Sequence, residues 1–145
     1  MKRFNFSLER VRRWRLEQLN VEELKLQQIR AERQALADAK QRVRDEFAYS
    51  RTEVLAQSSM LGGELEHLDS FRLHVQDRVR IFENREQQAE ARVLEQRARV
   101  LHARRQFELL EQLRVKALAK WRVTADQEQE TLTAELFLSR STRNG

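Results

Sequence analysis

The chain has 145 residues, of which 35% are charged and 40% hydrophobic, and its formal net charge is +5. This mixture is typical of coiled coils, and it argues against a thick globular core or a pocket of useful volume. The sequence contains no cysteine, which excludes disulfides and thiolate metal sites.

The amino-terminal segment carries six basic side chains and one acidic side chain in its first sixteen residues. It therefore lacks the uninterrupted apolar region of a secretory signal, and no later stretch reaches the roughly 20 apolar residues of a membrane span. We expect a soluble, cytoplasmic protein. A mitochondrial presequence is the alternative, although the same residue types continue without a break into the body of the predicted helix.

Proline is absent, and the two internal glycines are adjacent, at Gly62 and Gly63. Because proline costs about 3 kcal/mol and glycine about 1 kcal/mol inside a helix, this placement predicts two long helices joined at one turn. We predict an all-α protein, an antiparallel two-helix coiled-coil hairpin that forms one elongated domain over residues 1–145. The first helix is expected at about 7–59, the turn at about 60–64, and a longer second helix at about 65–139.

Helix-end signals accompany these boundaries. Ser7 offers a capping hydroxyl at the start of the first helix, and the glycine pair offers a C-cap at its end. Acidic residues follow the glycines at once, where negative charge favours the start of a new helix.

A heptad-like alternation of three and four residues predicts the packing seam of the first helix. Arg33 and Lys40 place charge in this seam, where their aliphatic stems can pack while the charges lie at its edge. Such positions weaken the packing but can specify the register. The predicted seam residues are Leu19, Leu26, Ile29, Arg33, Leu36, Lys40, Val43, Phe47 and Val54.

The same alternation is longer in the second helix, and three polar residues interrupt it, namely Glu86, Gln96 and Arg114. Its predicted seam residues are Leu68, Val75, Val79, Phe82, Ala89, Val93, Val100, Ala103, Phe107, Leu110, Ala117 and Trp121. A chain that folds back at the glycine pair places partners at numbers adding up to about 125. Phe4 is therefore expected near Trp121, and segment 123–138 should extend beyond the first helix.

Basic residues concentrate in the two segments that this register brings together, 1–16 and 97–122. Four acidic residues then reverse the sign on the unpaired extension: Asp126, Glu128, Glu130 and Glu135. A solvated surface accounts for most such charge runs. Arginine clusters also attract phosphate, so nucleic-acid binding is an alternative, but no aromatic stacking platform and no zipper with a basic region accompany them.

Residues that could carry chemistry are sparse. His67 and His74 could share a helix face with Glu66 or Asp77 in a metal site, but two histidines near a turn are more often surface residues. The sequence shows no glycine-rich phosphate loop and no nucleophile with its base. We expect no enzyme activity, metal, cofactor or small-molecule substrate.

The two end segments carry the most distinctive motifs. The chain opens with FNFSLERV at 4–11 and continues through Arg15 into an arginine-rich helix. It closes with LEQLR at 110–114, AKWR at 119–122 and QEQ at 127–129 before Leu132. Both segments, together with the length and the central turn, resemble the FliJ family of flagellar type III export proteins, the stalk proteins of the export ATPase.

The resemblance implies a stalk that inserts into the central channel of the hexameric flagellar export ATPase, promotes its activity and couples it to the export gate. Such a protein would act at the cytoplasmic face of the inner membrane, at the flagellar base, and could also escort export chaperones. The positions that match the family motifs would face the ATPase: Leu8, Val11, Arg15, Leu110, Arg114, Trp121, Arg122, Gln129 and Leu132.

In the resembled family, contact with the cytoplasmic domain of the export gate maps nearer the turn. Tyr49, Phe71 and Val75 occupy the matching positions, although Phe71 and Val75 are equally compatible with core packing. The chain departs from the family pattern because it lacks a second tyrosine there and has a shorter turn. The stalk of a virulence-type injectisome, a generic coiled-coil scaffold and a basic nucleic-acid-binding protein are the alternative functions.

Overall fold

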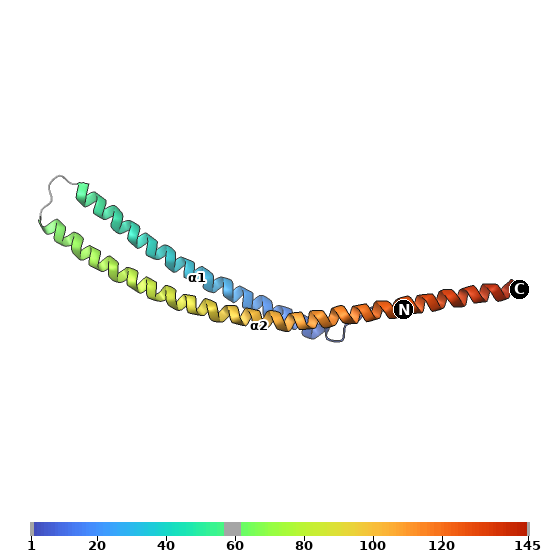
Figure 1. Ribbon diagram of the computed structural model, residues 1–145. Helices are drawn as coiled ribbons and strands as arrows, with labels where there is room; N and C mark the ends of the chain where they lie inside the picture. Colours follow the sequence, from blue (N-terminus) through green and yellow to red (C-terminus); the bar gives the residue numbers. More distant parts are fainter. Residues whose placement is uncertain (1, 57–61, 145) are drawn as a thin grey trace. The chain divides into compact units, whose positions relative to one another are not determined.

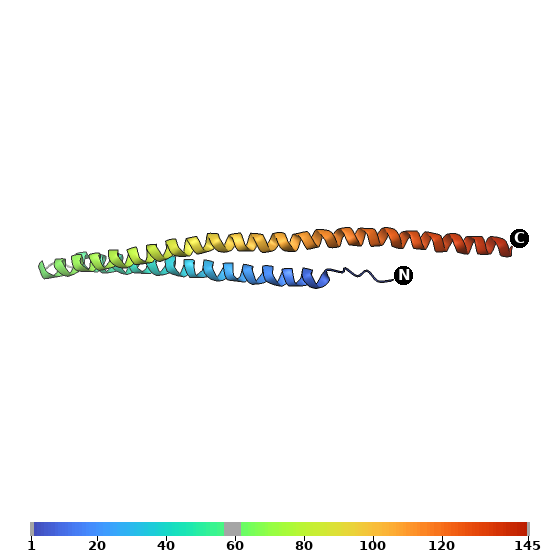
Figure 2. The same ribbon diagram turned by 90° about the horizontal axis from the view of Figure 1, so that it is seen from below.

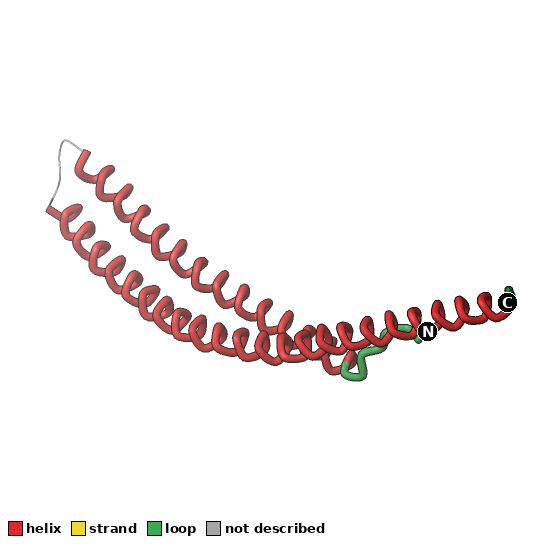
Figure 3. The backbone as a smooth tube through the Cα atoms, turned by 45° about the vertical axis from the view of Figure 1, so that its right-hand side comes forward, coloured by secondary structure: helices red, strands yellow, loops and turns green. Residues whose placement is uncertain are grey.

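The computed structural model describes residues 2–56 and 62–144, which form two long helices and no strand. Helix α1 spans Glu9–Ala56 and helix α2 spans Gly62–Arg143 (Figure 1). The segment before α1 is a loop (Figure 3). The prediction of an all-α chain with a longer second helix is confirmed, and the two helices pack against each other.

Helix ends differ from the prediction by a few residues. α1 begins at Glu9 rather than at residue 7, because the carbonyl of Leu8 accepts the first helical bond from the N–H of Arg12 at 2.9 Å. Leu8 therefore occupies the capping position that was assigned to Ser7. α2 extends to Arg143, past the expected end at residue 139.

The predicted turn at 60–64 lies partly outside the described residues, as does the predicted end of the first helix. The last three residues of the predicted turn, Gly62, Gly63 and Glu64, form the first turn of α2. The C-cap role predicted for the glycine pair is therefore wrong, because both glycines begin the second helix. Glycine is tolerated there since the first N–H groups of a helix lack intrahelical partners, and Glu64 complements the helix dipole.

The described chain divides into two compact units. The terminal unit comprises Met1–Val21 and Leu101–Gly145, and the central unit comprises Glu22–Val100. In the central unit, partners on α2 move back along the chain as those on α1 move forward. Arg33 pairs with Glu90, Lys40 with Glu86, and Arg44 with Glu83. The helices are therefore antiparallel in the central unit, with the partners that the predicted register requires.

The predicted seam is confirmed by burial in both helices. Every predicted seam residue is buried or half-buried, including the polar interruptions Glu86, Gln96 and Arg114. The most enclosed side chains are small: Ala89 and Val93 are each 3% exposed. A seam two helices wide buries one stripe of each helix and leaves the other faces in water, which is why so few residues are fully enclosed.

A buried amide fixes one end of the central unit. Gln96 is 5% exposed and donates from Nε2 to the backbone carbonyl and to the carboxylate Oε2 of Glu22. The hydrogen bond from Gln96 lowers the pKa of Glu22, and nearby Lys25 lowers it further, while burial opposes both. A polar interruption of the seam thus becomes a specific contact between the helices.

The lowered pKa of Glu22 predicts a pH-dependent stability. Because the folded pKa lies below the unfolded value, the contribution of Glu22 is present above its ordinary pKa and is lost as pH falls through the folded pKa. Urea unfolding of the native chain and of Glu22→Gln should show the native chain as the more stable at neutral pH, with the two curves converging on acidification. A difference in stability between the two chains that grows as the pH falls would contradict the lowered pKa of Glu22.

Candidate functional site

The terminal unit contains all nine residues that the sequence assigns to the ATPase-facing set. Its first part is the loop before α1, which lies alongside α2 (Figure 2). Phe6 in this loop is 8% exposed. The backbone carbonyl of Phe6 accepts a hydrogen bond from the N–H of Glu9 at 3.1 Å, in the turn that opens α1. The loop is therefore held by an apolar anchor and a backbone turn.

An aromatic clamp ties the same loop to α2. The rings of Phe4 and Trp121 meet edge to face with centroids 6.0 Å apart, as the predicted register requires. The indole Nε1 of Trp121 donates to the carbonyl of Lys2 at 3.2 Å. Trp121 thus helps to stabilise this unit, and only part of its side chain remains exposed to a partner.

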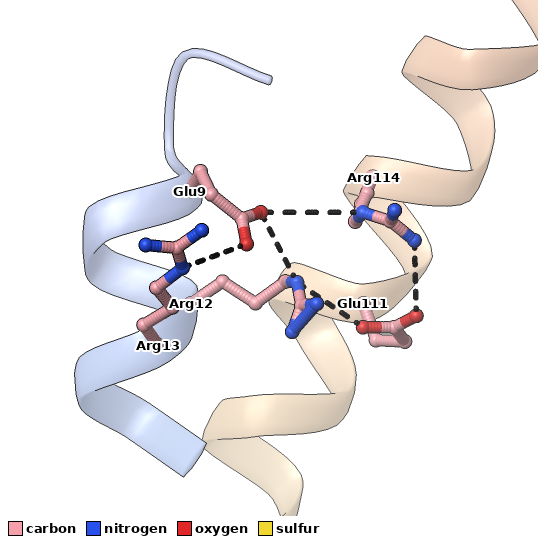
Figure 4. A network of polar contacts seen from close by, with 5 residues as sticks. All are labelled: Glu9, Arg12, Arg13, Glu111 and Arg114. Carbon is pink, nitrogen blue, oxygen red and sulfur yellow. Dashed lines mark hydrogen bonds and ion pairs between the residues drawn. The ribbon is translucent and has the colours of Figure 1, made fainter. Parts of the chain in front are cut away.

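A network of five charged residues lies where the first turn of α1 meets α2 (Figure 4). The carboxylate of Glu9 pairs with the Nε atoms of Arg12 and Arg13, each at 3.3 Å, and lies 4.0 Å from Nε of Arg114. Glu111 joins from α2, 3.5 Å from Arg12 and 3.8 Å from Arg114. Two carboxylates shared among three guanidinium groups hold the helices together without neutralising the surface.

Basic charge dominates the surface of this unit. Segments 2–21 and 101–122 together hold twelve lysines and arginines against four glutamates. The guanidinium of Arg12 also lies over the ring of Phe107, 5.8 Å from its centroid, so this basic side chain contributes to packing as well as to charge. A positive potential of this kind speeds the approach of an acidic partner and orients it.

The nine predicted ATPase-facing residues divide by exposure. Arg15, Leu110, Arg114 and Trp121 are half-buried, and the last two are engaged in the network and the clamp. The surface available to a partner comes from the exposed members: Leu8, Val11, Arg122, Gln129 and Leu132. Ala125 is 6% exposed, so the unpaired part of α2 starts after this residue rather than at residue 123.

The three residues assigned to the export gate lie in the central unit, with different environments. Tyr49 is 68% exposed and its hydroxyl donates to Glu53 at 3.4 Å. Phe71 is at the edge of the seam, with its ring centroid 5.9 Å from that of Phe47. Val75 is 7% exposed, so its side chain packs in the core and presents little surface to a partner.

Trp14 is a surface residue that the sequence motifs did not single out. It is 49% exposed, and the guanidinium of Arg15 stacks on its ring at 4.6 Å from the centroid. The available signal was its position three residues after Val11 and outside the seam alternation. A large aromatic side chain outside a seam is unusual enough to mark a surface for contact.

The terminal unit presents exposed apolar side chains beside basic ones. Among the described residues, no group of three or more His, Cys, Asp or Glu side chains is placed to hold a metal ion. In that same part of the chain, neither helix has the length and apolar character needed to cross a membrane. Comparison with known proteins finds no matching family model, no matching curated protein and no matching solved structure.

Proposed function

We propose that this chain is a stalk-like coiled-coil component of a flagellar type III export apparatus. It would bind the hexameric export ATPase through the terminal unit, promote ATP hydrolysis and couple it to the export gate. The observation that carries the proposal is the combination in one unit of the FNFSLERV opening, five exposed motif residues and a strongly basic surface. Acidic loops of the ATPase ring are the expected complement.

The half-buried motif residues support this proposal in a different way. Arg114 and Trp121 hold the start of α1 and the loop before it against α2, through Glu9 and through Phe4 with Lys2. A partner would therefore meet a preorganised surface, which lowers the entropic cost of binding. On this proposal the exposed residues make the contact and the half-buried residues shape it.

A pull-down and ATPase-rate assay with the purified flagellar export ATPase tests the function. The intact chain should bind and stimulate the ATPase, and truncation after Ala119 should abolish both effects. Because that truncation also removes the clamp at Trp121, the exposed variants Arg122→Glu and Leu132→Asp are the sharper test. Each should weaken binding at least about tenfold, or 1.4 kcal/mol, while the helix content stays unchanged.

The matched control is Leu94→Ser, since Leu94 is an exposed apolar residue of the same helix in the central unit. It should bind and stimulate as the native chain does. No binding by the intact chain would overturn the proposal. DNA affinity that falls steeply with salt would then favour a nucleic-acid partner for the same basic surface.

A further inference from the structure

The last part of α2 has an apolar stripe without a partner. After Ala125 every described residue of the helix is exposed, including Leu132 at 59% and Leu136 at 66%. At four-residue spacing, Leu132 and Leu136 share one side of the helix with Gln129. Glu128 and Glu135 border one edge of this side, and Asp126 borders the other. We call this side the Leu132 stripe.

This segment has little to stabilise it as a lone helix. Residues 126–143 continue α2 without burying any side chain, whereas packing of an apolar face supplies most of the stability of a protein helix. Thr131, Thr133 and Thr142 each donate a hydroxyl hydrogen bond to the carbonyl four residues earlier, a pattern that slightly destabilises a helix. The segment should therefore gain from covering its stripe.

A second unpartnered apolar surface lies at the start of α1 in the same unit. Val11, Trp14 and Val21 are between 42% and 49% exposed and fall on one side of α1, away from the seam. Arg10 and Glu17 border this side on one edge, and Arg15, stacked on Trp14, borders it on the other, so the border carries a net positive charge. We call this surface the Trp14 face.

We propose that the Leu132 stripe of one copy docks on the Trp14 face of a second copy. The two surfaces match in chemistry, because each has an apolar centre and their borders carry opposite charge. They also match in length, since residues 11–21 of the Trp14 face and residues 126–136 of the Leu132 stripe with its borders each cover about 16 Å of helix at 1.5 Å per residue. The acidic border of the stripe would lie beside Arg10 and Arg15.

The partner must be a second copy rather than the same chain. α2 is continuous from Gly62 to Arg143, so its last turns cannot fold back onto α1 of their own chain without breaking the helix. Two copies related by a two-fold axis can satisfy both surfaces at once, since each donates a stripe and receives one. Such an interface is self-complementary and closes at a dimer.

Sedimentation equilibrium of the purified full chain tests the dimer, in an assay that contains no ATPase and does not depend on the proposed function. Over about 1–100 μM at low salt, the native chain should shift from a mass of 17.4 kDa toward twice that value. Leu132→Asp should remain monomeric over this range. Leu109→Asp is the control, because Leu109 is an exposed apolar residue of α2 in the same unit but outside both surfaces, and it should still dimerise.

Charge exchange tests the pairing itself. Glu128→Arg and Arg10→Glu should each weaken dimerisation about tenfold or more, and the double variant should recover most of the loss, since its charges are again opposite. A native chain that is monomeric throughout overturns the proposal. A dimer that survives Leu132→Asp, or a double variant weaker than both single variants, overturns it equally. Circular dichroism of each variant checks that the helices remain.

Discussion

Val93→Asp is expected to unfold the packed helices of the central unit. Val93 is 3% exposed in the seam, so the new carboxylate would be buried without a partner. An uncompensated buried charge costs about 3–5 kcal/mol, which is a large part of the stability of a protein that packs along one seam. Thermal melting followed by circular dichroism should show the loss, and acidification should restore part of it by protonating the carboxyl group.

Leu94→Asp is the matched control for this prediction. It introduces the same side chain one position along the same helix, where the leucine is 58% exposed. Surface substitutions of this kind usually change stability by no more than about 0.5 kcal/mol. Equal melting curves for the two variants would mean that the seam does not run through Val93.

Reversing one charge of the Lys40–Glu86 pair is expected to destabilise the central unit, and reversing both is expected to restore it. Nζ of Lys40 lies 3.1 Å from a carboxylate oxygen of Glu86, and both side chains are largely covered by the seam. Neighbouring carboxylates at Glu83 and Glu90 pair with Arg44 and Arg33. Lys40→Glu would therefore place a fourth carboxylate next to those of Glu83, Glu86 and Glu90.

A double-mutant cycle measures this coupling. Lys40→Glu and Glu86→Lys should each lower the free energy of unfolding by about 1–3 kcal/mol, and the combined variant should regain most of that loss. The exposed pair of Arg92 with Glu32 is the control, with an expected coupling below about 1 kcal/mol. Additive effects at Lys40 and Glu86 would show that this pair does not help to set the register.

The proposed ATPase contact and the proposed dimer use some of the same residues. Val11 and Leu132 belong to the exposed motif residues and also to the two surfaces of the dimer. If both proposals hold, the ATPase and a second copy compete for the terminal unit. Raising the concentration of the free chain should then reduce the stimulation per molecule, and Arg10→Glu should lessen this effect.

The proposed contact surface was only partly predictable from the sequence. The motif comparison selected Arg122, Gln129 and Leu132, which are exposed, but also Arg114 and Trp121, which are engaged in internal contacts. A motif identifies positions and cannot tell whether a side chain shapes a surface or forms it. Val75 illustrates the same limit, since its spacing from Phe71 suits a binding pair and a core pair equally, and burial decides for the core.

The linear pattern was sufficient for two helices, their antiparallel pairing and the seam, including charged members such as Lys40. Those features follow from periodicity and from the confinement of glycine, which are local properties of the chain. Tertiary contacts decided the rest: the hydrogen bond from Trp121 to the carbonyl of Lys2, the sharing of Glu9 among three arginines, and the exposure of Trp14. These depend on which side chains of two distant segments meet and on the directions they take, and no repeat in the sequence records that geometry.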